Sequence, residues 1–168
     1  MRKMHRILGP LAAAGLIVTA SCSGGGDEGP PSSDGDGEET AAAPEVEETP
    51  AADSTDTMDG TVFADFTGDA AAGETIFSQC RACHVVDPDV NRTGPTLHNI
   101  VGAEAGQIDG FNYTDANANS GIVWTPEKLF QYLERPQRII PGTRMAFAGL
   151  SDPQDRADLI AYLEANSE

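Results

Sequence analysis

The sequence Cys80-Arg81-Ala82-Cys83-His84 holds the residues with the clearest chemistry in this chain. Two cysteines with two residues between them, followed at once by histidine, are typical of covalent attachment of a c-type haem. Residues three apart share one face of a helical turn, so both thiols can reach the two vinyl groups of a single porphyrin. His84 can then offer an imidazole nitrogen to the iron. A methionine on the opposite side would favour ferrous iron and raise the reduction potential.

The same motif has two other readings in proteins, a redox-active cysteine pair and one half of a zinc site. The chain has three cysteines, and the third, Cys22, lies near the N-terminus. No second pair is therefore present to complete a zinc site. The region also lacks the βαβ pattern that accompanies redox-active pairs. The motif predicts one haem, held covalently through Cys80 and Cys83.

The elements that must position this motif are predicted to be helices. Three segments begin with a capping residue and continue with apolar residues at helical spacing: 69–79, 125–135 and 151–163. Pro126 and Pro153 fall in the first turns of the second and third segments, where proline is favoured. The second helix must end before Pro136. No run alternates as a strand, so we expect residues 63–168 to form an all-α domain.

Residues 1–22 resemble a bacterial secretory signal. A basic start precedes an apolar run over 7–20, which is too short for a comfortable membrane span. Small residues precede Cys22, as at a lipoprotein processing site, although Thr19 stands where leucine is usual. We expect Cys22 to be lipidated and to anchor the protein on the periplasmic side of a bacterial membrane. Ordinary cleavage and an uncleaved short anchor are the alternatives.

Residues 23–62 are predicted to be an acidic, disordered tether. Positions 23–60 carry twelve acidic residues and no Lys or Arg, and they have few large apolar side chains. A flexible coil of about 40 residues has a root-mean-square span of about 35 Å. Such a segment would let the domain move between membrane partners, or it would serve only as a solubilising spacer. The net charge of −17 for the whole chain argues against nucleic-acid binding.

Several longer motifs accompany the haem motif in the C-terminal part of the chain. In order, they are GDAAAGETIF (68–77), TGPTLH (93–98), GFNYTDAN (110–117), GIVW (121–124), PGTRMAFAG (141–149) and DLIAYL (158–163). With CRACH at 80–84, this series resembles class I monohaem cytochromes c of the mitochondrial type over residues 68–168. The resemblance implies the fold of that family, in which the N- and C-terminal helices cross near Gly73 and Phe77 around one haem.

The resemblance also implies the second iron ligand. Met145, in the Pro-Gly loop, matches the axial methionine of the family, opposite His84. His98 is the competing candidate, and a second histidine would give a centre of lower potential. With both axial positions filled, the iron could exchange an electron and would have no open site for oxygen or peroxide.

Further residues match positions around the haem in the family. Pro95 corresponds to the carbonyl that accepts a hydrogen bond from the ligand histidine. The remaining matches are at the propionates or beside the methionine sulfur: Tyr113, Asn117, Trp124, Tyr132 and Thr143. Plain core packing is the alternative role for the aromatic members. Ala103 departs from the family, which usually has an arginine near a propionate at this place.

The resemblance implies a single-electron carrier and no enzymatic activity. We expect a monomer that takes electrons from a quinol–cytochrome c reductase and passes them to a terminal oxidase, or serves a photosynthetic reaction centre. Five of the seven basic residues after position 60 lie in or beside the haem motifs, which predicts a modestly basic haem face. The alternatives are a haem subunit docked permanently to a larger oxidoreductase, and a haem sensor or peroxidase-like protein.

Overall fold

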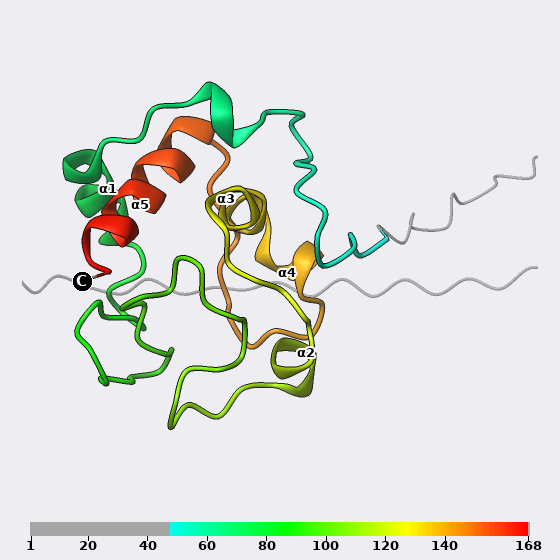
Figure 1. The fold of residues 1–168 in the computed structure, drawn as a ribbon, viewed down its shortest axis with the longest axis vertical. Coiled ribbons are helices and arrows are strands. Elements are labelled where there is room, and N and C mark those ends of the chain that lie inside the picture. Colours follow the sequence, from blue (N-terminus) through cyan, green and yellow to red (C-terminus); the bar gives the residue numbers. More distant parts are fainter. Residues whose placement is uncertain (1–47, 168) are drawn as a thin grey trace, which may run out of the picture. The chain divides into compact units, whose positions relative to one another are not determined.

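The computed structural model describes residues 48–167, so the expected signal segment, Cys22 and the tether up to residue 47 lie outside the described residues. Within 48–167 the chain forms helices and no strand, apart from one isolated bridge between Glu104 and Val123 (Figure 1). In chain order the helices are η1 (Phe63–Asp65), α1 (Ala70–Phe77), α2 (Asp115–Ala118), α3 (Pro126–Glu134), α4 (Pro136–Ile139) and α5 (Pro153–Ala165). The predicted all-α fold is confirmed.

The three longer helices begin where the capping residues predict. Asp69 accepts hydrogen bonds from the backbone of the first turn of α1, and Thr125 and Asp152 do the same for α3 and α5. Each cap satisfies a donor that a helix start leaves without a partner inside the helix. α3 ends at Glu134, before Pro136 as expected, but Pro136 itself begins the short helix α4. In the described part of the chain, no helix is long and apolar enough to cross a membrane.

Helices α1 and α5 cross at Gly73 (Figure 1). A Cβ atom at this glycine would lie 2.6 Å from the carbonyl carbon of Asp158 and 2.8 Å from Cβ of Tyr162, so only hydrogen fits between the helices. Next to the crossing, the rings of Phe77 and Tyr162 contact each other in a tilted arrangement, with centroids 5.0 Å apart. The carboxylate of Asp158 also accepts a hydrogen bond of 2.8 Å from the backbone of Asp69. The first and last long helices of the domain are thus packed against each other, and the predicted crossing near Gly73 and Phe77 is confirmed.

The long connection between α1 and α3 is held by backbone hydrogen bonds between its own parts. Gly94 donates to the carbonyl of Cys83 at 2.9 Å, and Leu97 donates to that of Val85 at 2.7 Å. Further along, Trp124 donates to the carbonyl of Ala103 at 2.9 Å, and Gly102 donates to that of Trp124 at 2.9 Å. These bonds fix the loops around the space beside α3.

Residues 51–61, which we call the strap, lie against α3, α4 and α5, although the sequence places them in the expected tether. In Figure 1 the strap (cyan) passes α4 before the chain reaches η1. Side chains of Lys128, Gln131, Arg138 and Arg156 donate hydrogen bonds to it. The composition of residues 23–62 suggested a segment without structure, whereas the end of that segment is held by polar groups on the helices.

Candidate functional site

One cavity of about 700 Å³ lies in the middle of the described residues. It is lined by the end of α1, the haem motif, the loops over 93–117, Trp124, one face of α3, the loop over 143–147, and α5. All ten predicted cofactor-binding residues line it: Cys80, Cys83, His84, Pro95, Tyr113, Asn117, Trp124, Tyr132, Thr143 and Met145. The fold therefore brings together residues that are spread over 66 positions of the sequence. Ala103 and His98 are not among its lining residues.

The two cysteines occupy a helical turn that continues from α1. The backbones of Cys83 and His84 donate to the carbonyl of Cys80 at 3.0 and 2.9 Å. Both cysteines are free thiols in this structure, Cys80 partly buried and Cys83 exposed. Burial, together with the neighbouring Cys83, raises the pKa of Cys80 to about 11. Cys80 is therefore kept as a neutral thiol, which would not suit a reactive redox pair.

His84 points one ring nitrogen away from the cavity and leaves the other for a ligand. Its Nδ1 lies 2.8 Å from the carbonyl oxygen of Pro95. A carbonyl can only accept, so Nδ1 carries the proton and Nε2 keeps a free lone pair. Burial lowers the pKa of His84 more than the bond to Pro95 raises it, and the ring stays neutral. Gly94 leaves room for this ring, since a Cβ there would come within 2.7 Å of Nδ1.

Met145 lines the cavity from a loop that several hydrogen bonds hold. Its backbone N–H donates to the hydroxyl of Thr143 at 3.3 Å, and Gln137 donates to its carbonyl at 2.9 Å. The Tyr132 hydroxyl lies 3.9 Å from the sulfur and donates to it. Burial raises the pKa of Tyr132 to about 12, so the phenol stays protonated as a donor. His98, the competing candidate, instead places Nδ1 3.0 Å from the backbone carbonyl of Asn166.

One residue that lines the cavity holds an unused hydrogen-bonding atom. Oδ1 of Asn117 is buried without a hydrogen-bond partner in the structure. Tyr113 and Trp124 line the same cavity. A buried amide oxygen without a partner costs free energy unless a ligand or water supplies a donor. The site therefore has room for a group with polar ends beside Asn117.

The cavity also contains apolar residues that were not among the predicted cofactor-binding residues. They include Leu97, Ile100, Phe111, Leu129, Leu133, Leu159 and Leu163. On α3, Leu129, Tyr132 and Leu133 stand three and four positions apart, so helical spacing alone could have identified Leu129 and Leu133 as facing the site. Leu159 and Leu163 stand four positions apart on α5, so the same spacing could have identified them. Leu97, Ile100 and Phe111 come from loops, where no periodicity indicates the direction of a side chain.

The donor set and shape fit a haem better than the alternatives. Two thiols, one imidazole nitrogen and one thioether sulfur face a largely apolar space, as a flat apolar ring with a metal at its centre requires. Residues 48–167 contain no group of three or more His, Cys, Asp or Glu side chains placed to hold a metal ion, so a zinc site does not fit.

The comparisons with known proteins agree with this geometry. Residues 70–167 match the family described as Cytochrome c. Cytochrome c type-1 of Ascaris suum is 53% identical over 98 residues, which cover 58% of this chain and 88% of that protein. Cytochrome c2 of Rhodomicrobium vannielii is 50% identical over 97 residues, covering 57% and 78%. The solved structure of cytochrome cH from Methylobacterium extorquens matches with a TM-score of 0.56 and 47% identity, covering 58% of this chain and 99% of that one.

The family match covers more than half of the chain and contains the haem motif, the Met145 loop and both crossing helices. The chain belongs to the cytochrome c family, whose members are electron-transfer proteins that bind haem c covalently through a pair of cysteines, here Cys80 and Cys83.

Proposed function

We propose that the protein is a membrane-tethered, periplasmic electron carrier in which His84 and Met145 ligate the iron of one haem. The observation that carries the ligand assignment is that His84 and Met145 line one cavity, while His98 is bonded elsewhere. When bound, the haem supplies a metal centre that gains and loses one electron. The chain's own residues set how that centre is held and what can reach it.

Each ligand has a neighbour that limits its movement. The carbonyl of Pro95 accepts a hydrogen bond from Nδ1 of His84 and so directs Nε2 toward the cavity. Thr143, Gln137 and Tyr132 hold the backbone and sulfur of Met145. Ligands that are fixed in place reorganise little when the charge of the metal changes, which favours rapid electron exchange. Ligation of the iron by both His84 and Met145 would also favour a carrier over a sensor or peroxidase-like protein, because those functions need a ligand that leaves.

A titration of the haem-loaded protein, followed by absorbance, tests the ligand assignment. The weak red band of ferric iron–methionine ligation should be present, with a high reduction potential. Met145→Ala should lose the band, lower the potential and bind carbon monoxide in the reduced state. His98→Ala, the matched control, should keep the band and the potential. Loss of the band in His98→Ala with retention in Met145→Ala would contradict the assignment.

The proposed location follows from the N-terminal sequence. A signal over 1–22 with a lipidated Cys22 would place the domain outside the inner-membrane barrier, where a quinol–cytochrome c reductase, a terminal oxidase or a photosynthetic reaction centre can exchange electrons with it. A tether raises the local concentration of the carrier near such partners. Relatives named cytochrome c2 and cytochrome cH occur in bacteria, which supports a bacterial carrier.

The anchor is tested by expressing the full chain in a bacterium. The wild-type protein should partition into detergent and carry the mass of an acylated N-terminus, whereas Cys22→Ser should appear in the aqueous phase. A wild-type protein that is water-soluble and ends in an unmodified residue would refute the anchor and leave the haem assignment intact.

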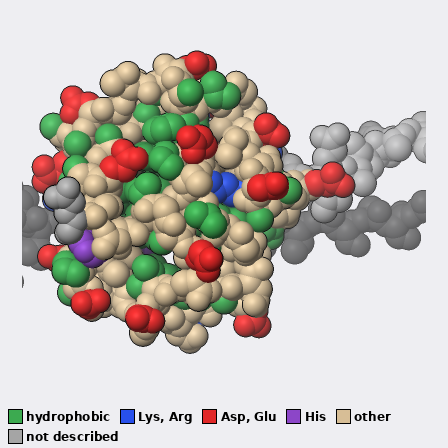
Figure 2. All heavy atoms as spheres, viewed as in Figure 1, with side chains coloured by type: hydrophobic (Ala, Val, Ile, Leu, Met, Phe, Trp, Pro, Cys, Tyr) green, Lys and Arg blue, Asp and Glu red, His purple; other side chains and the backbone are tan. Residues whose placement is uncertain are grey.

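The surface gives limited support for electrostatic docking. Figure 2 shows one face, where acidic side chains are spread around apolar ones and few basic side chains are visible. Arg144 lines the cavity and is exposed, but Arg81 pairs with Glu74 at 3.2 Å and Arg138 donates to the strap. Any basic character of the haem face therefore depends on fewer side chains than the sequence suggests.

A further inference from the structure

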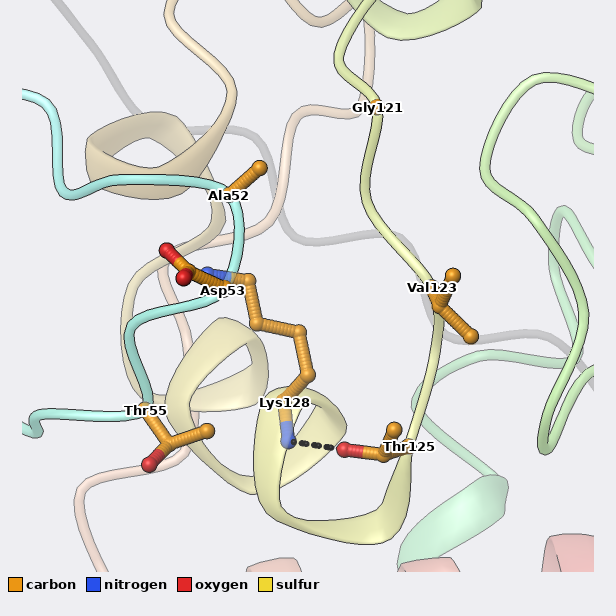
Figure 3. Close-up of a pocket in the computed structure, with 7 residues that line it drawn as sticks. All are labelled: Ala52, Asp53, Thr55, Gly121, Val123, Thr125 and Lys128. Carbon is orange, nitrogen blue, oxygen red and sulfur yellow. Dashed lines mark hydrogen bonds between the residues drawn. The ribbon is translucent and has the colours of Figure 1, made fainter.

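The strap lies outside the part of the chain that matches the cytochrome c family, residues 70–167. Its first contact is with Lys128, the side chain of which is only 2% exposed. Nζ of Lys128 donates to the backbone carbonyls of Ala51 at 3.2 Å and Ser54 at 2.7 Å, and to the side chain of Gln131 at 2.7 Å. Figure 3 shows the Lys128 side chain extending from α3 toward the loop that carries Ala52 and Asp53.

The second contact is with Arg156 of α5, which is fully buried. Its guanidinium forms an ion pair with Asp59, donates to the hydroxyl of Thr61 at 3.1 Å, and lies 4.3 Å from the ring centroid of Phe130. Glu134 completes this group: its carboxylate lies 3.4 Å from Arg156 and accepts the backbone N–H groups of Met58 at 2.7 Å and Asp59 at 3.0 Å.

These contacts account for the position of the strap energetically. A buried ammonium or guanidinium is costly unless hydrogen bonds or an opposite charge compensate for the lost water. Two carbonyl oxygens of the strap accept hydrogen bonds from Lys128. Asp59 pairs with Nη2 of Arg156, whose Nε and Nη1 have no hydrogen-bond partner in the structure. Hydrogen bonds from Thr61 and Arg156 outweigh the effect of burial and lower the pKa of Asp59 to about 2, so the carboxylate stays charged.

Helix α3 separates the strap from the haem cavity. The strap contacts Lys128, Gln131 and Glu134, which follow one another at intervals of three on one face of the helix. The cavity is lined by Leu129, Tyr132 and Leu133, which lie on the other face. None of residues 48–62 lines the cavity.

We propose that the strap is a docked part of the domain, held by Lys128 and Arg156. The N-terminal extension then joins the domain behind α3, on the side of this helix opposite the haem cavity. This arrangement leaves the haem side open to redox partners. The free linker to an anchor is then shorter than residues 23–62, because residues 51–61 belong to the domain. The strap itself does not depend on lipidation. Only its use in orienting an anchored carrier rests on the proposed function.

Amine labelling tests whether the strap is docked. Lys128 is the only lysine besides Lys3, so a small acylating reagent followed by peptide mass spectrometry reports on it alone. In the haem-loaded full chain, Lys128 should react at least about tenfold more slowly than in the urea-unfolded chain, since reaction requires local opening. Asp59→Ala should accelerate labelling severalfold, while Asp65→Ala, an exposed acid of η1, should not.

Each result bears on the proposal. Labelling of the wild type at the unfolded rate would overturn it. An unchanged rate in Asp59→Ala would overturn the role of the ion pair with Arg156. The haem absorbance spectrum of each variant shows whether the domain is intact, so a folding defect is recognised separately.

A second experiment tests on which side of the domain the N-terminal extension leaves. In a Cys22→Ser background, Ala52→Cys and Ala146→Cys each provide one free thiol for a large maleimide polymer; both alanines are exposed, and Ala146 lines the haem cavity. Reduction by a purified quinol–cytochrome c reductase should slow severalfold for the Ala146 conjugate and stay unchanged for the Ala52 conjugate. Equal slowing at both positions would refute the exit behind α3. Neither outcome depends on whether Cys22 is lipidated.

Discussion

Gly73→Ala should destabilise the domain by about 2 kcal/mol, although alanine is the better helix former. The added Cβ would lie 2.6 Å from the carbonyl carbon of Asp158, where ordinary contact begins at 3.4 Å. The carbonyl oxygen of Asp158 lies closer still, and neither this backbone group nor Cβ of Tyr162 can rotate away, so the two helices must separate by more than about 1 Å. Overpacking of this kind costs up to about 3 kcal/mol, and the gain in helix propensity returns about 1 kcal/mol.

Urea unfolding of the haem-loaded protein, followed by circular dichroism, measures this effect. Ala71→Gly is the matched control, because Ala71 is exposed in the same helix and should lose only the propensity difference of about 1 kcal/mol. A separation of α1 and α5 should also weaken the contact of Phe77 with Tyr162, which absorbance or fluorescence of the tyrosine can detect. A Gly73→Ala protein as stable as the wild type would refute the argument that the crossing requires glycine.

Three further predictions concern the strap, a helix cap and the haem side. The pKa of Asp59 is lowered from 3.8 to about 2, so its stabilising contribution should be complete above pH 4 and lost as the pH falls through 2; Asp59→Asn should remove this dependence from urea unfolding curves. Thr125→Ala should cost about 1 kcal/mol by removing the cap of α3, measured in the same way, while Thr55→Ala should not. Arg144→Gln should slow electron transfer from an acidic partner at low salt, and the difference from the wild type should vanish as ionic strength rises.

The local sequence predicts the long helices because their starts use side chains that act over a few residues. Asp69, Thr125 and Asp152 cap the helices in the way that their positions suggest. Helices α2 and α4 have four residues each, too few for an apolar periodicity to develop. The grouping of the ten site residues in one cavity followed from the family resemblance, since their spacing does not show that distant loops meet.

The strap could not be predicted, and the reason is physical. Apart from Met58, which is exposed, its residues are small, polar or acidic, so it buries little of the apolar surface that usually offsets the entropy of ordering a chain. What holds it are two cations on helices α3 and α5, Lys128 and Arg156, which in the sequence look like ordinary surface residues. A segment that supplies backbone carbonyls as acceptors shows no sequence pattern for this role, because every residue carries a carbonyl group.

Occupation of both faces of α3 has a consequence for how this protein tolerates substitution. Six consecutive residues of the helix, 128–133, are buried, with Lys128 and Gln131 among them. In an ordinary surface helix, the polar positions accept many replacements with little loss of stability. Here a saturation-mutagenesis scan should find Lys128 and Gln131 as intolerant as Leu129, so the usual relation between side-chain polarity and mutational freedom fails along this helix.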